Sequence, residues 1–103
     1  AMLMIEDPGA LEAAEAIAET PGYSVLSCGI GSLTGALGDD RDAGETAAEG
    51  ILGHATRVGM PSMMTANRSN MARRIEQGYL GLLLQMGDDP AETIQLGRAA
   101  AGR

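Results

Sequence analysis

Four short apolar runs alternate with longer stretches of helical periodicity along the chain. The apolar runs cover residues 2–5, 23–28, 61–65 and 79–85. Each has the length of a strand, and the last is apolar at almost every position, which is typical of strands buried in a parallel sheet. The pattern therefore predicts four strands, of which 79–85 is the most clearly buried.

The first helical stretch carries both a start and a stop signal. Asp7 is predicted to cap a helix that has Pro8 at its first position. Leu11 and Ile17 belong to its apolar stripe, and the pair Pro21-Gly22 ends it. One continuous helix is expected between the first two strands.

The later helices show similar signals. Asp42 with Glu45 three residues later resembles a capping box and predicts a second helix that runs to Gly59. A third helix is expected over about 69–77, and Asp89-Pro90 repeats the cap and proline of a helix start. A helix is therefore expected after each of the four strands.

Four strand-helix repeats define the expected architecture. Apolar strands joined by short helical connections favour a parallel sheet with right-handed crossovers and helical cover. Four βα units make either half of a (β/α)8 TIM barrel or a small doubly wound sheet, and composition does not separate these two. At 103 residues the chain is expected to form a single domain over 1–103.

The carboxyl ends of the strands are where such folds carry their sites. Glu6, the Gly-rich loop 29–34 and the segments 65–67 and 85–87 are expected to meet at one rim. A carboxylate suits a cation, and the backbone amides of a Gly-rich loop suit an anion. No G-x-G-x-x-G stands at a strand exit and no Lys-Ser or Lys-Thr pair follows the loop, so dinucleotide and P-loop sites are excluded.

Composition and charge narrow the class of protein. Apolar residues make up 45% of the chain, but Trp and Phe are absent, and seven Met and fifteen Gly give a flexible interior. Such an interior lacks the large rigid side chains that usually stabilise a small free-standing domain, which suggests that the chain is part of a larger protein. A net charge of −7 argues against nucleic acid and membrane surfaces as partners. No secretory signal precedes the first strand and no apolar segment approaches the roughly 20 residues that span a bilayer, so a cytoplasmic protein is expected.

The single cysteine and the single histidine are assigned structural roles. Cys28 excludes an internal disulfide framework and lies in an apolar run, so a small core residue is expected rather than a nucleophile. His54 lies within the second helix beside its apolar stripe, where a structural or surface role is favoured over catalysis.

Polar residues around the third helix give weaker signals. Arg68, Arg73 and Arg74 are expected to lie in or beside this helix as solvated charge. Asn67 and Gln85 stand at strand exits and are candidates to line a pocket.

Several segments, in order, resemble the second half of the 2-oxo-acid aldolase and citrate lyase β-subunit superfamily. They are Met4-Ile-Glu-Asp7, the stretch from Thr20 to Gly38 that contains Ser-Cys-Gly-Ile-Gly-Ser-Leu-Thr-Gly, Ala55-Thr-Arg-Val-Gly-Met-Pro61 and Gln77-Gly-Tyr-Leu-Gly81. The resemblance covers essentially the whole chain. It implies strands five to eight of a phosphoenolpyruvate/pyruvate-type (β/α)8 barrel whose last helix commonly swaps between subunits.

The resemblance also implies roles for two parts of the rim. A Glu that closes the fifth strand binds Mg²⁺ or Mn²⁺ in the family, and Glu6 is the matching position. The family loop Gly-Pro-Ala-Asp-Leu-Ser binds the carboxylate of the oxo acid through backbone amides. Its equivalent here implies that Gly29, Ile30, Gly31 and Ser32 bind substrate.

The chain departs from the family in two respects. The position of the family's second metal-binding carboxylate is Ser32 here, which offers only a neutral hydroxyl. Three alternatives follow: Asp39 or Asp40 supplies the missing carboxylate, or substrate and water complete the coordination of the metal, or the chain belongs to a variant subgroup with altered chemistry. Asp7 is explained by its capping position. The catalytic His and substrate-binding Arg of the family come from earlier strands, so no catalytic base is assigned.

The resulting hypothesis is part of a metal-dependent lyase that cleaves a 4-hydroxy-2-oxo acid to pyruvate and an aldehyde, inactive as an isolated chain. The alternatives are a non-catalytic α/β half-barrel module and an acyl-CoA lyase similar to citrate lyase. A half barrel leaves strand edges unpaired, so either a homo-oligomer or an N-terminal half is expected as partner.

Overall fold

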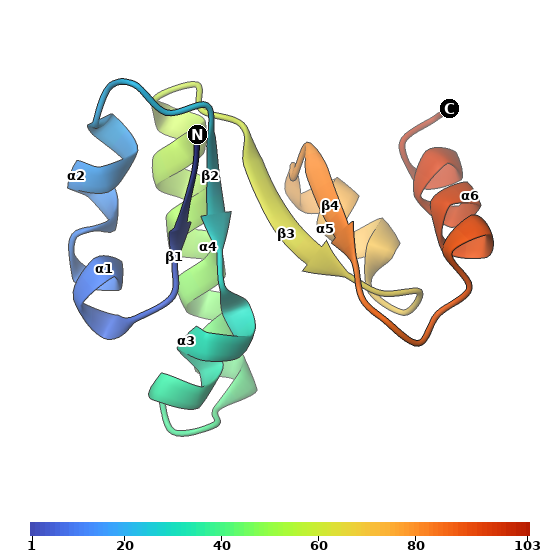
Figure 1. The fold of residues 1–103 in the computed structure, drawn as a ribbon, viewed down its shortest axis with the longest axis horizontal. Helices are drawn as coiled ribbons and strands as arrows, with labels where there is room; N and C mark the ends of the chain where they lie inside the picture. Colours follow the sequence, from blue (N-terminus) through green and yellow to red (C-terminus); the bar gives the residue numbers. More distant parts are fainter. The chain divides into compact units, whose positions relative to one another are not determined.

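The computed structural model describes residues 1–103 and shows an α/β chain (Figure 1). Four strands alternate with helices in a parallel sheet of order β1-β2-β3-β4, which confirms the predicted strand-helix repeat. The chain divides into two compact units, residues 1–62 and 63–103. The expectation of a single domain over 1–103 stays a prediction, and each unit is described by itself below.

The first unit is built on two parallel strands. Strands β1 (Met2–Ile5) and β2 (Val25–Cys28) pair with Ile5 opposite Cys28. Ile5 and Leu26 are 1% and 0% exposed and form the centre of the core. The second strand is two residues shorter than the apolar run that predicted it, because the strand begins only at Val25, after a bend at Ser24.

The stretch expected to be one helix is two short helices. Helix α1 (Pro8–Glu12) begins at the predicted cap, where the Asp7 carboxylate accepts the Ala10 amide at 2.9 Å. Helix α2 (Ala14–Glu19) follows after a break at Ala13. The predicted start is therefore confirmed, but continuity across Ala13 is wrong.

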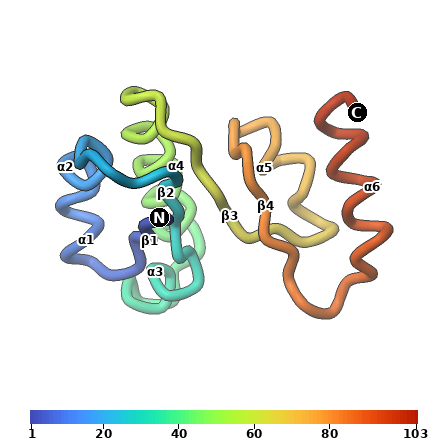
Figure 2. Tube along the Cα trace, turned by 45° about the horizontal axis from the view of Figure 1, so that its top comes forward, coloured from blue at the N-terminus to red at the C-terminus, as the bar shows by residue number.

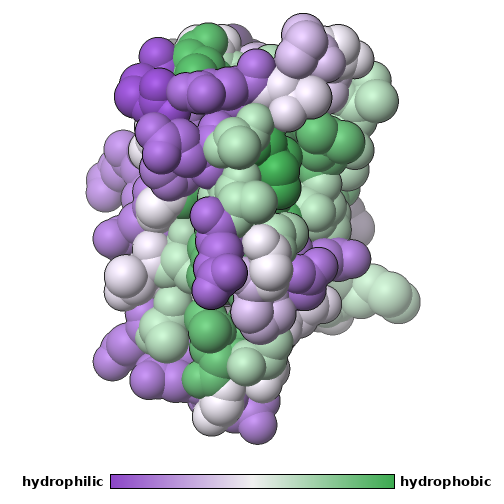
Figure 3. Space-filling model, turned by 90° about the vertical axis from the view of Figure 1, so that its left-hand side faces the viewer, coloured by the Kyte–Doolittle hydropathy of each residue, from purple (hydrophilic) through white to green (hydrophobic).

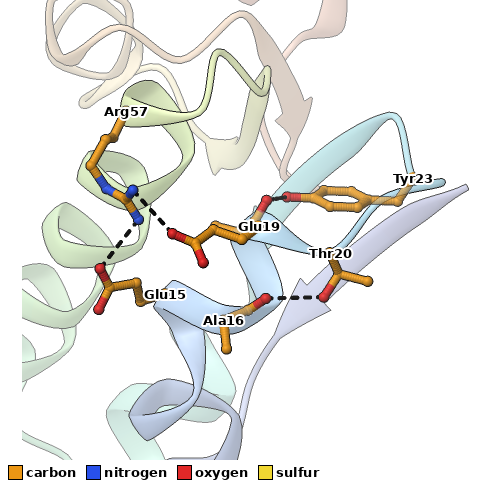
Figure 4. Close-up of polar contacts among 7 residues, drawn as sticks. Glu15, Ala16, Glu19, Thr20, Tyr23 and Arg57 are labelled. Atoms are coloured by element: carbon orange, nitrogen blue, oxygen red, sulfur yellow. Dashed lines mark hydrogen bonds and ion pairs between the residues drawn. The ribbon is translucent and has the colours of Figure 1, made fainter.

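An exposed cation joins α2 to helix α4 (Arg41–Arg57). The Arg57 guanidinium donates to Glu15 at 3.3 Å and to Glu19 at 3.1 Å (Figure 4). All three side chains are about half exposed, so each pair contributes about 0.2–1 kcal/mol. Nearby, the Tyr23 hydroxyl donates to the Ala18 carbonyl at 2.8 Å, and burial raises the pKa of Tyr23.

The side of the molecule that carries α1 and α2 mixes hydrophilic and hydrophobic residues, as Figure 3 shows. The outward glutamates of these helices, Glu12, Glu15 and Glu19, are exposed, whereas Ala14 and Ala18 are each 2% exposed. The helical periodicity read from the sequence thus separates the buried stripe from the solvated one.

The Gly-rich segment after β2 is a helix rather than a loop. Helix α3 (Ile30–Ala36) begins at Gly29 and buries Leu33 completely. It lies so close to α4 that a Cβ on Gly44 would clash with the Thr34 hydroxyl. Gly31 and Gly35 obscured this helix in the sequence, because glycine is a poor helix former. The burial of Leu33 and the close approach of α4 at Gly44 compensate.

Helix α4 starts two residues earlier than expected, because Asp40 and not Asp42 is its cap. The Asp40 carboxylate accepts the amides of Asp42 and Ala43 at 3.0 and 3.2 Å. Asp42 lies within the first turn.

We expect Asp40→Ala to lower the free energy of unfolding by about 1 kcal/mol, because two amides of the first turn lose their acceptor. Asp42→Ala removes the same charge from the same helix end but no capping bond, so a smaller loss is expected. Urea unfolding of both variants measures the difference. A loss for Asp42→Ala equal to or larger than that for Asp40→Ala would contradict the assignment of the cap.

The second unit repeats the strand-helix order. Strand β3 (Ser62–Ala66) pairs in parallel with β4 (Gly81–Leu84), with Ala66 opposite Leu84. Helix α5 (Met71–Gln77) ends at Gly78, which adopts φ 106° as a left-handed cap. Helix α6 (Pro90–Ala100) lies beside α5 (Figure 2).

The prediction that 79–85 is the most buried strand is wrong. Strand β4 is confined to four residues, and Leu83 and Leu84 are 42% and 37% exposed. Leu80, just before it, is 80% exposed. Strand β4 ends the sheet, so no further strand of this chain lies along its outer edge. No helix of the chain has the length and apolar character needed to cross a membrane.

Candidate functional site

The first unit joins the ends of its two strands directly. The Gly29 amide, immediately after β2, donates to the Ile5 carbonyl at the end of β1 at 2.8 Å. Glu6 is the next residue after Ile5, so this bond holds the backbone of the predicted metal ligand beside the start of the predicted substrate loop. Parallel pairing of β1 with β2 therefore places the carboxylate and the loop at the same end of the sheet.

Glu6 approaches Gly29 so closely that no side chain fits there. A Cβ on Gly29 would lie 2.6 Å from Glu6 Cβ and 3.0 Å from Glu6 Oε2. The sulfur of Met4 would lie 3.4 Å from the same point. Gly29 is thus required by a close approach rather than by a positive φ, since its φ is −82°. The glycine and the carboxylate identified separately in the sequence form one cluster.

The open amides of the loop are those of Ile30, Gly31 and Ser32. They form the first turn of α3, where helical amides have no intrahelical acceptor. The Gly29 amide is engaged with Ile5, and the Gly29 carbonyl accepts the Leu33 amide at 3.0 Å. Gly29 therefore contributes its small size, and the following three residues contribute the donors.

The other carboxylates of this unit do not join Glu6. Asp39 and Asp40 come after α3, which is about 10 Å long at 1.5 Å per residue, and Asp40 is occupied as the cap of α4. Asp7 caps α1. Of the three alternatives raised for Ser32, a carboxylate supplied by Asp39 or Asp40 is the one that these positions do not support.

The donor set therefore contains one carboxylate. No group of three or more His, Cys, Asp or Glu side chains in the chain lies close enough to hold a metal ion. Glu6 and the Ser32 side chain are both exposed and offer oxygen atoms, which hard divalent cations prefer. Mg²⁺ is commonly held by one or two carboxylates with water and substrate oxygens, so the residues fit a substrate-assisted site and not a closed protein site.

The single cysteine adjoins this cluster only through the buried backbone of β2, where it pairs with Ile5 and precedes Gly29. Cys28 is 3% exposed, as expected for a core residue. His54 is half-buried in the last turn of α4, at the opposite end of that helix from its cap.

Two loops of the second unit are tied together by amide side chains. Asn67 Nδ2 donates to Gln85 Oε1 at 3.0 Å, and the Gln85 amide donates to the Ala66 carbonyl at 3.0 Å. Asn67 Oδ1 also accepts the amides of Ser69 and Asn70. The two candidate pocket residues are thus hydrogen-bonded to each other, but the side-chain oxygen of Asn67 also fixes the turn that follows it.

Arg68 makes a second connection between these loops. Its amide donates to Asp88 Oδ2 at 2.8 Å and its guanidinium contacts Glu92 Oε1 at 2.8 Å. These two acidic partners were not identified from the sequence, because they flank the Asp89-Pro90 helix start, where acidic residues are common.

Arg74 is buried, which contradicts its assignment as solvated charge. It is 3% exposed within α5, and its NH1 donates to Gln77 at 3.2 Å. Arg68 is exposed as expected. Arg74 follows the buried Met71 by three residues, so the two side chains lie on the same face of α5. This helical spacing is the signal in the sequence that indicates a buried Arg74.

Comparisons with known proteins show the fold. No family model and no curated protein matches the sequence. Among solved structures, macrophomate synthase matches 98% of this chain and 36% of that chain, with a TM-score of 0.70 and 23% identity. A citrate synthase variant, SbnG, matches 98% of this chain and 46% of that chain, with a TM-score of 0.70 and 19% identity.

The likeness confirms the predicted fold class. The four βα units correspond to part of a larger enzyme of the TIM-barrel type, and the chain spans less than half the length of either similar structure.

Proposed function

We propose that the chain is the C-terminal half-barrel part of a metal-dependent carbon-carbon lyase of the 2-oxo-acid aldolase and citrate lyase β-subunit superfamily. The contact of Glu6 with Gly29 carries this proposal, because it brings the family's metal-binding position against its substrate loop. The fold shared with two synthases supports it.

In this proposal each part of the site has a separate task. Glu6 provides the one carboxylate for Mg²⁺ or Mn²⁺, and the amides of Ile30, Gly31 and Ser32 bind the carboxylate of the oxo acid. A divalent ion held there would polarise the 2-oxo group and stabilise the negative charge that develops as the carbon-carbon bond breaks. Gly29 keeps Glu6 next to those amides by leaving room for its side chain.

The substrate proposed for the complete enzyme is a 4-hydroxy-2-oxo acid, which would give pyruvate and an aldehyde. Cys28 is buried and His54 lies in the last turn of α4, so in this proposal the base and the arginine that completes the oxo-acid site come from outside this chain. An N-terminal half barrel or a homo-oligomer would supply them, and the isolated chain is expected to be inactive.

A non-catalytic half-barrel module is the second candidate. Ser32 in place of a carboxylate and the lack of any three-ligand cluster favour it. In that case Gly29 and Glu6 would simply form a tight strand exit.

Mn²⁺ titration followed by electron paramagnetic resonance separates the two candidates. We expect the wild-type chain to bind Mn²⁺ more tightly when oxalate or pyruvate is present, because the oxo acid completes the coordination that one carboxylate begins. Glu6→Gln should weaken this binding by more than tenfold, because it removes the only charged ligand. Glu12→Gln, an exposed glutamate on α1, is the matched control and should bind as wild type does.

Equal loss in both variants, or no Mn²⁺ binding by folded wild-type protein with either oxo acid, would remove metal-dependent lyase function from this chain. Circular dichroism of each sample establishes that it is folded.

A further inference from the structure

The open face of β1 carries two methionines in front of the candidate metal ligand. Successive side chains of a strand alternate between its two faces, so Met2 and Met4 point away from the face of Ile5. Ile5 is 1% exposed in the core, whereas Met2 and Met4 are 45% and 42% exposed. Glu6 continues the alternation just after the strand, on the side of the methionines. The carboxylate is therefore preceded on its own face by two thioether side chains.

The Met4 sulfur lies at the same glycine as the Glu6 carboxylate. Both surround the position that a Cβ on Gly29 would occupy, with Met4 Sδ 3.4 Å and Glu6 Oε2 3.0 Å from that point. Met2 lies one step further back along the same face, where it is opposite Val25. An ion held by Glu6, and a molecule bound to that ion, therefore have Met4 as their nearest apolar neighbour from β1.

The chemistry of a thioether makes Met4 an apolar wall and not a metal ligand in such a site. Its sulfur is a soft donor, whereas Mg²⁺ and Mn²⁺ prefer oxygen. It is also a weak hydrogen-bond acceptor, so a hydroxyl held against it loses water and gains no equivalent partner. An alkyl group avoids this cost, because the unbranched methionine side chain adapts to apolar neighbours of different shape.

We propose that Met4 selects the oxo acid by the substituent on carbon 3, the carbon at which the carbon-carbon bond breaks. The inference rests on the proposed function, in which the carboxylate and the 2-oxo oxygen of the substrate are taken by the α3 amides and the metal ion. Carbon 3 is then the part of the oxo acid that contacts the side chains around Glu6, and Met4 is the apolar one among them. Pyruvate and 2-oxobutanoate, which carry hydrogen or methyl at carbon 3, are accepted, and 3-hydroxypyruvate is disfavoured.

Calorimetric titration of oxo acids into the chain loaded with Mn²⁺ tests this selection. The wild type is expected to bind pyruvate and 2-oxobutanoate about tenfold more tightly than 3-hydroxypyruvate, because the hydroxyl is buried against the thioether without a partner. Met4→Gln keeps an unbranched side chain of similar length but ends in an amide, so it should remove this difference. Oxalate has no carbon 3, and its affinity should be the same in Met4→Gln as in the wild type.

Met2→Gln is the matched control, since Met2 is similarly exposed on the same face but lies further from Glu6. It should keep the wild-type preference among the three oxo acids. If Met4→Gln kept that preference while oxalate still bound with Mn²⁺, the role of Met4 would be overturned and the proposed function would stand. An equal loss of preference in Met2→Gln would overturn the role of Met4 as well. Failure of folded wild-type protein to bind Mn²⁺ with oxalate would overturn both.

Discussion

Gly29→Ala is expected to destabilise the first unit and to displace Glu6. The new Cβ would lie 2.6 Å from Glu6 Cβ, and because that atom is fixed to the backbone it cannot swing away as the tip of a flexible side chain would. Overpacking of this kind costs about 1–3 kcal/mol. The oxalate-dependent binding of Mn²⁺ should also weaken by more than tenfold, because the carboxylate moves away from the amides of α3.

Gly31→Ala is the matched control for this prediction. Its Cβ would meet no atom within 4 Å, and it lies in α3, where alanine is favoured over glycine by up to about 1 kcal/mol. Urea unfolding and the Mn²⁺ titration should therefore show equal or greater stability and unchanged binding. If Gly29→Ala bound Mn²⁺ and oxalate as well as Gly31→Ala does, the contact between Glu6 and Gly29 would have no part in the site.

The second large effect is expected at Leu33, the one residue of α3 that is completely buried. Leu33→Ala should lower the free energy of unfolding of the first unit by about 2–5 kcal/mol, because it removes buried methyl groups and leaves a cavity. Alanine is the better helix former, so any loss reports packing and not helix propensity. Oxalate-dependent Mn²⁺ binding should weaken too, because α3 presents the amides of the site.

Leu37→Ala provides the comparison, since Leu37 caps the same helix and is only half-buried. A smaller loss of stability is expected there. If both variants unfolded at the same urea concentration, α3 would not be anchored through Leu33.

Local signals in the sequence determined the elements whose stability is local. Asp7 and Asp89 cap their helices as predicted, and Gly78 ends α5, because a cap depends on a few neighbouring residues and their backbone angles. Strand β1 coincides with its apolar run. The approach of Glu6 to the Gly-rich segment also followed from the sequence, since parallel strands end at the same edge.

Tertiary contacts decided what the local signals could not. Helix α3 exists in spite of its glycines because Leu33 is buried and Gly44 admits a close helix, and neither contact is visible in a window of sequence. The burial of Arg74 and the partial exposure of β4 likewise depend on tertiary contacts. The sequence by itself determined the order of strands and helices and the candidate carboxylate. The tertiary structure decided which amides remain open and which apolar residues remain uncovered, because both depend on neighbours that are distant along the chain.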